Sequence, residues 1–482
     1  MNIKMVSHTV GRLLSVEAIL MLLPLVVSLI YKEFNIAICF GITVFLTFAV
    51  SLMMRAPKIS NTKIYAREGF VSVALSWILM SIFGAVPFVI SGEIPSIVDA
   101  LFEVVSGFTT TGATILVDIE SLSRGLLFWR AFTHWIGGMG IIVFVLAILP
   151  QKDMQSMHIM RAEVPGPSVG KLVSKTSVTA RILYLIYAFL TVSLVVALLL
   201  CGMPVFDSIT NALSAAGTGG FCIRNASIAY YNNVAAEIVL SVGMLLFGIN
   251  FNLFYLLIIK QFKRAFKSEE LWTYLGIVAV SVALITFNIL PLVGSVGESL
   301  RQAGFQVVSI ITTAGFGTAD FGAWPTLSQF IIILLMFSGA CTGSTGGGLK
   351  IGRIMILIKS VFRELRRAVN PRSVKCIKLD GAVIDKEIIS TTNVYFTVYM
   401  IIIAIATFLI SLDNIDLLGA LTSVISCVNN VGPGLSSSGM LSHFADYSAF
   451  SKAIFTAVML IGRLEIFPVI ILFSPNTWKK SA

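Results

Sequence analysis

A glycine-rich segment at 338–353 carries the residue types most able to do chemistry, and it reads SGACTGSTGGGLKIGR. Such a segment either cradles a phosphate with its backbone N–H groups or provides unwound backbone along an ion path. A Walker-type phosphate loop needs Ser or Thr directly after its lysine and lies between a strand and a helix. Here Leu349 precedes Lys350, Ile351 follows it, and both flanks are apolar. Spacing and context therefore disfavour the phosphate loop and favour unwound backbone.

Four further segments share a pattern of small and polar residues, and they read DALFEVVSGFTTTGATI, DSITNALSAAGTGGFCI, QAGFQVVSIITTAGFGT and GALTSVISCVNNVGPGL. They align without gaps on four glycines, Gly112, Gly220, Gly315 and Gly432. Each segment then has a serine six residues before the glycine and a polar residue nine before it: Ser106, Ser214, Ser309 and Ser426, and Glu103, Asn211, Gln306 and Ser423. Ser and Gly are common in membrane helices, but that explains their presence and not their common phase. We therefore interpret the segments as a fourfold internal repeat.

The four segments offer backbone oxygens of the kind that replace the water shell of a potassium ion. The candidate ion-binding residues are Thr110, Thr111 and Gly112; Thr218, Gly219 and Gly220; Thr313, Ala314 and Gly315; and Asn430, Val431 and Gly432. Glycine at the shared position permits a φ value closed to other residues, so that carbonyls can turn inward. None of these loops carries a carboxylate, which disfavours a tight calcium or magnesium site.

Membrane helices must position these loops, because 57% of the residues are apolar and only 12% are charged, against about 25% charged in a typical soluble domain. Ten apolar runs are long enough to cross a hydrocarbon layer of about 30 Å: Leu13–Ile30, Ile36–Met54, Phe70–Ile90, Leu126–Leu149, Ile182–Cys201, Ala235–Ile259, Tyr274–Val293, Phe330–Ile358, Val394–Leu412 and Ile454–Phe473. The first lacks a small-residue cleavage site and is expected to be a retained helix. The expected fold is an all-α polytopic membrane protein with ten transmembrane helices.

Four units follow from combining the runs with the segments, since each segment lies between two runs as a short helix and a re-entrant loop. Residues 1–66 supply two extra N-terminal helices, and the units occupy 67–165, 166–268, 269–378 and 379–482. All four units have one orientation, so their loops can converge on a pseudo-fourfold axis.

Lys and Arg gather in alternate loops, which predicts that those loops and both termini are cytoplasmic. The longest basic loop runs from Lys359 to Lys386. This asymmetry accounts for the net charge of +10, so a nucleic-acid partner is not needed. The basic loop suits anionic lipid or a protein partner equally well.

The eighth run, Phe330–Ile358, is longer than one crossing requires, so a break inside it leaves two helices joined by unwound chain. The candidate gate is this stretch with two nearby cations: Gly343, Ser344, Thr345, Gly346, Gly347, Gly348, Lys350 and Arg463. Arg463 lies near the middle of the last run, where a lipid-facing charge costs at least about 2.5–3.5 kcal/mol. We expect Arg463 to face the pore and contact the loop, and Glu465 to lie between helices. The alternatives are glycines that serve close helix packing and an arginine bonded to carbonyls without influence on flux.

Five stretches resemble the TrkH family, the membrane subunits of bacterial Trk potassium uptake systems: SGFTTTGAT, HWIGGMGIIVFVLAILP, FQVVSIITTAGFGTADF, GSTGGGLK and GRLEIFPVI. The two extra N-terminal runs favour this form over the related eight-span KtrB proteins. The resemblance implies a pore within each monomer, a homodimer in the bacterial inner membrane, and potassium selectivity linked to the four glycines. It also implies that the glycine-rich segment is the gate and that a cytosolic nucleotide-binding ring, TrkA, controls opening. Potassium is then the substrate, nucleotide belongs to the partner only, and no cofactor is covalently bound.

Potassium uptake through a channel-like pore is therefore the predicted function, and an enzyme is not expected because no nucleophile–base pair or metal cluster appears. A potassium symporter coupled to protons or sodium is an alternative, whose mark is a titratable group near mid-membrane. A pump subunit resembling KdpA is a third, although the chain has no nucleotide motif. We interpret His134 as structural, the six cysteines as buried thiols, and four acids near the short helices, Asp99, Glu103, Asp207 and Glu298, as complements of helix dipoles rather than a negative vestibule.

Overall fold

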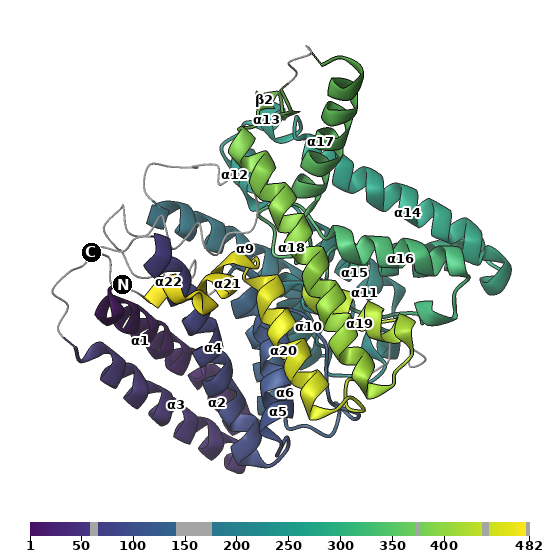
Figure 1. The fold of residues 1–482 in the computed structure, drawn as a ribbon. Coiled ribbons are helices and arrows are strands. Elements are labelled where there is room, and N and C mark those ends of the chain that lie inside the picture. Colours follow the sequence, from purple (N-terminus) through teal and green to yellow (C-terminus); the bar gives the residue numbers. More distant parts are fainter. Residues whose placement is uncertain (58–65, 141–175, 372–375, 436–442, 479–482) are drawn as a thin grey trace.

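The computed structural model describes residues 1–57, 66–140, 176–371, 376–435 and 443–478 (Figure 1). In these described residues all regular elements are helices except for one small hairpin, in which β1 (Lys378–Leu379) pairs antiparallel with β2 (Ala382–Val383). Six helices are long and apolar enough to cross a membrane, and two bent helix pairs raise the number to eight. The helical membrane fold is thus as expected. The expected count of ten is not established, because the run Leu126–Leu149 is described only to Gly140 and the run Phe330–Ile358 forms two helices.

Four groups of helices make up most of the molecule, each with a long helix, a short helix and a second helix, which is divided into two pieces in the last three groups. The first has α4 (Ala66–Ser91), α5 (Ile97–Phe108) and α6 (Arg124–Gly138); the second has α9 (Thr176–Leu200), α10 (Val205–Gly217), α11 (Val234–Phe247) and α12 (Phe251–Ile258). The third has α14 (Glu269–Val293), α15 (Val296–Ile311), α16 (Thr326–Ser338) and α17 (Ile351–Val369); the fourth has α18 (Lys386–Ile410), α19 (Leu417–Asn429), α20 (Ala449–Arg463) and α21 (Phe467–Phe473). Short connecting pieces are α13 (Phe262–Ala265), α22 (Pro475–Trp478), η1 (Ser227–Tyr231), η2 (Phe321–Ala323) and η3 (Ser411–Asp413).

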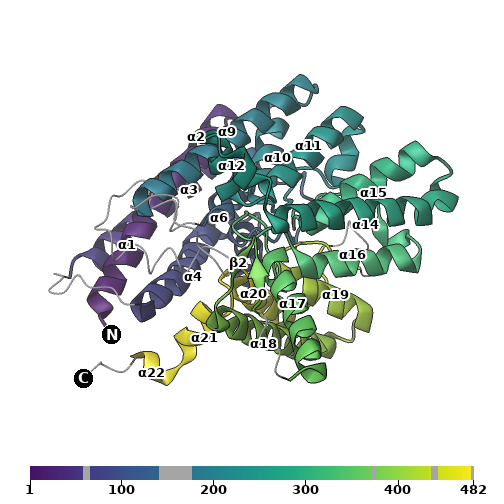
Figure 2. The ribbon, with the colours of Figure 1, turned by 90° about the horizontal axis from the view of Figure 1, so that it is seen from above.

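The short helices close the four groups into a cycle. Each packs within its own group and also against the second helix of the preceding group: α5 on α20, α10 on α6, α15 on α11, and α19 on α16. Figure 2 shows the groups arranged around a common centre. The loops that follow the short helices are therefore brought to that centre.

The N-terminal helices α1 (Ile3–Leu20), α2 (Leu22–Ile30) and α3 (Phe34–Arg55) lie at the edge of the molecule, against α4 and α6 (Figure 1). The first helix begins ten residues before the predicted Leu13, because the Asn2 side chain caps it by accepting from the Met5 N–H at 3.3 Å. Small residues let α1 and α3 approach closely, and the Ser51 hydroxyl donates to the Gly11 carbonyl at 2.8 Å.

Two of the predicted apolar runs are sharply bent, a feature that the sequence did not predict. The run Ala235–Ile259 turns by 90° between α11 and α12, and the run Ile454–Phe473 turns by 119° between α20 and α21. At the first bend the Asn250 side chain caps α12 by accepting from the Asn252 N–H at 2.9 Å. At the second, Glu465 and Ile466 have positive φ values of 58° and 65°. Apolar content does not encode either bend.

The basic segment from Lys359 to Lys386, expected to be a loop after the eighth apolar run, is partly helical. Helix α17 continues to Val369 and carries Lys359, Arg363, Arg366 and Arg367, while Lys386 is the first residue of α18. Helix α17 stands away from the main body (Figure 1).

Candidate functional site

The four threonine- and glycine-containing loops have one shared backbone conformation. Each has a non-glycine residue with positive φ, namely Thr110, Thr218, Thr313 and Asn430 at 55–60°. Two residues later each has a glycine with positive φ, namely Gly112, Gly220, Gly315 and Gly432 at 73–101°. The left-handed region is costly for residues with a side chain, so its recurrence at the same position marks a common geometry.

These glycines form a closed ring with the residue before each of them. A Cβ at Gly112 would collide with the Gly219 carbonyl oxygen, one at Gly220 with that of Ala314, and one at Gly315 with that of Val431. A Cβ at Gly432 would lie 2.6 Å from the Thr111 carbonyl oxygen, which closes the cycle. Each loop thus touches the next through a glycine and a carbonyl. All twelve predicted ion-site residues lie in this structure, which we call the ring (residues 110–112, 218–220, 313–315 and 430–432).

The four serines that lie six residues before the ring glycines shape the ring through their main chain. The carbonyls of Ser106, Ser214, Ser309 and Ser426 accept from the N–H groups of Thr111, Gly219, Ala314 and Val431 at 2.8–2.9 Å. All four serines are completely buried. A small side chain at this position lets each loop fold back onto the end of its short helix.

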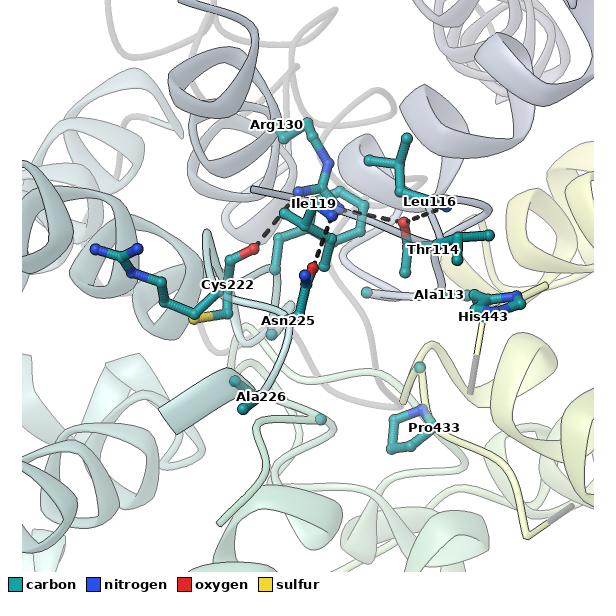
Figure 3. A pocket seen from close by; sticks show the side chains of 18 residues that line it. Ala113, Thr114, Leu116, Ile119, Arg130, Cys222, Asn225, Ala226, Pro433 and His443 are labelled. Carbon is teal, nitrogen blue, oxygen red and sulfur yellow. Dashed lines mark hydrogen bonds between the residues drawn. The ribbon is translucent and has the colours of Figure 1, made fainter. Parts of the chain in front are cut away.

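A cavity of about 380 Å³ opens on one side of the ring (Figure 3). All four ring glycines line it, together with Arg130, Cys222, Arg224 and His443. We call this cavity the mouth. At its rim, the Arg224 guanidinium pairs with Glu120 at 3.1 Å and with Asp207 at 3.4 Å.

The rim is stiffened by Tyr231, whose hydroxyl donates to Asp207 Oδ2 at 2.8 Å. Burial, followed by the neighbouring Cys222 and Asp207, raises the pKa of Tyr231 above its ordinary value. The hydroxyl therefore keeps its proton and remains a donor. The predicted dipole acids Asp99 and Asp207 do lie in first helical turns, but each also has a cationic partner, Lys452 at 2.8 Å and Arg224.

On the other side of the ring lies the break between α16 and α17, residues 339–350, which we call the glycine loop. The Gly347 N–H donates to Thr313 Oγ1 at 2.7 Å. A Cβ at Gly346 would lie 2.9 Å from the Thr312 carbonyl oxygen, and one at Gly347 would collide with that of Asn429. The loop therefore presses directly on the third and fourth ring loops, and its glycines are required by close backbone approach.

Arg463 joins the glycine loop to the first group of helices. Its guanidinium donates to the Thr345 carbonyl at 3.0 Å and to the Gly138 carbonyl at 2.8 Å, with Gly137 as a further acceptor. Lys350 is buried and its ammonium donates to the Gly346 carbonyl within the loop. Both predicted cations thus contact the loop.

Glu465 lies between helices and pairs with Arg353 in the first turn of α17, whose guanidinium also stacks 4.2 Å from the centre of the Tyr395 ring. This ion pair connects the bend of the last helix with the helix that continues from the glycine loop. Sequence reasoning placed Glu465 between helices but did not identify its partner.

Two other anchors of the glycine loop were missed. Glu270 Oε1 accepts from the Thr342 N–H at 2.6 Å and from the Gly352 N–H at 2.9 Å, so one carboxylate fastens both ends of the loop. The bend between α11 and α12 supplies the second anchor: the Cys341 N–H donates to the Gly248 carbonyl at 3.0 Å, and the Phe251 N–H to that of Gly343 at 3.1 Å. Glu270 looks like an ordinary first-turn acid, so its sequence position gave no signal.

His134 is completely buried and its ring stacks on Phe221 at 4.2 Å. It lies so close to Gly219 that a Cβ there would collide with its imidazole. Neither imidazole nitrogen has a hydrogen-bond partner within the described part of the chain. Within the same part, no group of three or more His, Cys, Asp or Glu side chains is arranged to hold a metal ion.

Comparisons with known proteins agree over the length of the chain. The model of the TrkH cation transport protein family matches residues 36–480. Two Trk system potassium uptake proteins TrkH, from Salmonella typhimurium and Escherichia coli (strain K12), are 37% and 36% identical to it over 100% of both sequences. The crystal structure of the potassium transporter TrkH from Vibrio parahaemolyticus has a TM-score of 0.89 at 32% identity and covers 99% of this chain and 100% of that one. The chain therefore belongs to the TrkH family, whose members are cation transport proteins and not enzymes.

Proposed function

We propose that this chain carries potassium ions across the bacterial inner membrane through the ring. The observation that carries the proposal is the closed cycle in which each glycine abuts a carbonyl oxygen of the next loop. Backbone carbonyls at Thr111, Gly219, Ala314 and Val431 can replace an ion's water shell without a fixed charge that would hold it too tightly. The named relatives are potassium uptake proteins, which supports the same substrate here.

The glycine loop is the proposed gate, with Lys350 and Arg463 as its cations. An ion that passes from the mouth through the ring meets Gly346 and Gly347, which press on the ring from the other side. Conduction therefore requires the loop to move. Its hydrogen bonds to Thr313, Arg463 and Glu270 define the contacts that must break or follow the motion.

Helix α17 is the proposed route from a partner to the gate. It starts directly after the glycine loop and, beyond Arg353 in its first turn, carries four further basic residues, Lys359, Arg363, Arg366 and Arg367. A force on this helix is transmitted to the loop, because the Ile351 N–H bonds to the Ala340 carbonyl at 3.1 Å across the break. In line with the TrkH resemblance, we propose a homodimer with cytoplasmic termini, surrounded by membrane lipid, on which a cytosolic TrkA-like nucleotide-binding ring acts.

The test is ion flux through the purified chain in liposomes, measured for potassium, rubidium, sodium and lithium. Gly112→Ser places a side chain against the Gly219 carbonyl and should lower the potassium-to-sodium flux ratio by about tenfold, which corresponds to 1.36 kcal/mol of lost discrimination. An unaltered ratio in folded protein would contradict the assignment of the ring as the selectivity filter.

A potassium symporter is the second candidate, and Glu17 favours it. This carboxyl lies within α1, is completely buried, and neither of its oxygens has a hydrogen-bond partner among the described residues. Buried carboxyls in membrane helices are candidate proton carriers. Flux that follows the potassium gradient alone supports the channel, whereas potassium movement driven by an imposed proton gradient supports the symporter.

A further inference from the structure

The first ring loop is held from behind by a buried ion pair. Arg130 of α6 and Glu103 of α5 approach to 2.7 Å, and their side chains are only 2% and 0% exposed. The corresponding residues behind the other three loops are uncharged, namely Asn211, Gln306 and Ser423. A buried ion pair is weak evidence for stability, because desolvation offsets much of the attraction between the charges. The presence of a charge at only one of these four equivalent positions calls for another explanation.

Glu103 ties the short helix to the part of the loop that leaves the ring. Its carboxylate accepts from Thr114 Oγ1 at 3.0 Å and from the Ile115 N–H at 3.0 Å, in addition to Arg130 Nε at 2.7 Å. Thr114 is two residues after Gly112. The carboxylate therefore fixes the outward end of the first loop relative to α5.

Arg130 extends this tie to the second loop. Its guanidinium lies 4.1 Å from the centre of the Phe221 ring and donates to the Cys222 carbonyl at 3.5 Å. It also donates to Thr114 Oγ1 at 3.3 Å. Figure 3 shows Arg130 between Thr114 and Cys222 at the mouth. One side chain thus contacts residues within two positions after Gly112 and Gly220, the glycines of two adjacent loops.

The tie within a single loop does not need a charge. In the third loop, Gln306 Nε2 donates to the Ala319 carbonyl at 3.1 Å, and in the fourth, the Ser423 hydroxyl lies 3.1 Å from the Tyr447 hydroxyl. The charge on Glu103 is explained by its partner, because a buried guanidinium that reaches across two loops needs a carboxylate beside it.

We propose that Glu103 and Arg130 are positioning residues that set the spacing of the first two ring loops and thereby the discrimination between potassium and sodium. The inference rests on the proposed function, since it assumes that the ring selects the ion. The two residues act through the loop backbone and have no contact with the ion in the proposal. A fixed spacing of carbonyl oxygens matters because the oxygens must match the size and hydration of the larger ion.

The experiment compares potassium and sodium flux in liposomes for Arg130→Met, Glu103→Gln and the double variant. The double variant is the decisive one, because it leaves neither an unpaired buried cation nor an unpaired buried anion. We expect it to remain folded, to retain potassium flux, and to have a potassium-to-sodium flux ratio about tenfold lower than wild type. A change of this size is within the range of couplings measured in hydrogen-bond networks. Thr114→Val removes the hydroxyl that both charged residues contact and should lower the ratio in the same direction.

The matched control is Glu298→Gln, which removes an ion pair of the same 2.7 Å length with Arg301 at the start of α15, away from the ring. It should leave the ratio unchanged. A wild-type ratio in both the double variant and Thr114→Val overturns the inference. If Gly112→Ser still lowers the ratio in that case, only the positioning role fails; if Gly112→Ser also has no effect, the proposed function fails with it.

Discussion

At the scale of single residues, Arg463 is the clearest connection between the glycine loop and the rest of the molecule. We expect Arg463→Ala to raise cation flux in the absence of any partner protein. The variant loses the bonds to the Thr345 and Gly138 carbonyls, and one hydrogen bond from a charged donor contributes about 1.5–3 kcal/mol. If half of about 1.5 kcal/mol stabilises the closed conformation of the loop relative to the open one, its loss raises the open population about threefold or more. Flux per reconstituted protein measures this.

Lys452→Met is the control for this prediction. Lys452 is also a cation of α20 and is buried, but it pairs with Asp99 and does not contact the glycine loop. Equal flux in Arg463→Ala and in the Lys452 variant would show that Arg463 is a structural residue without influence on the gate.

The sequence predicted that Arg463 contacts the glycine loop, because a charge near the middle of an apolar helix must find water or a partner. It did not identify the Gly137 and Gly138 carbonyls as acceptors, since these lie more than 300 positions earlier in the chain. Nor did it pair Glu465 with Arg353. Both misses involve contacts between groups of helices, which spacing within one helix does not encode.

At the scale of elements, the break in the third group depends on Glu270 as well as on its glycines. We expect Glu270→Ala to loosen the glycine loop and raise flux, because the buried Thr342 and Gly352 N–H groups lose their acceptor. An unsatisfied buried group costs about 1–3 kcal/mol. Glu270→Gln keeps one amide oxygen as an acceptor and should have a smaller effect. Flux and the exchange rates of these two amide hydrogens are the measurements.

The neighbouring residue supplies the control for Glu270. Glu269 lies next to it in the first turn of α14, is half-buried, and pairs with Lys359 instead of the loop. Glu269→Ala should leave both amides protected. Faster exchange in Glu269→Ala than in Glu270→Ala would contradict the fastening role.

The length of the run Phe330–Ile358 and its glycines were sufficient to predict the break between α16 and α17. The bend between α11 and α12 was missed, because the run Ala235–Ile259 is long and mostly apolar. Its signals were weak: Gly248, which a helix tolerates, and Asn250, whose capping role depends on a turn that must already exist. The structure shows that the bend supports the glycine loop, so its cause lies in tertiary contacts.

At the scale of the whole molecule, the ring exists only because four groups of helices close into a cycle. The common phase of the four serines predicted which residues share a geometry, and the serine carbonyls do make the same bond in every loop. The order of contacts, in which each short helix packs on the preceding group, did not follow from the pattern. A repeat in sequence defines equivalent positions but not the neighbours across their interfaces.

The cycle predicts a ranking of Gly→Ala variants at its four glycines. A Cβ at any of the four glycines would collide with the neighbouring carbonyl oxygen, but the overlap is smallest at Gly432, where the separation would be 2.6 Å. We therefore expect Gly432→Ala to keep more of the potassium-to-sodium flux ratio and a higher unfolding temperature than the other three. The matched control is Gly202→Ala, because Gly202 has a φ of 83° with nothing within 4 Å of its Cβ position. That variant should lose only the left-handed strain of about 1–2 kcal/mol and leave selectivity intact. If Gly220→Ala matched Gly202→Ala in both measurements, contact between adjacent loops would have no part in selecting the ion.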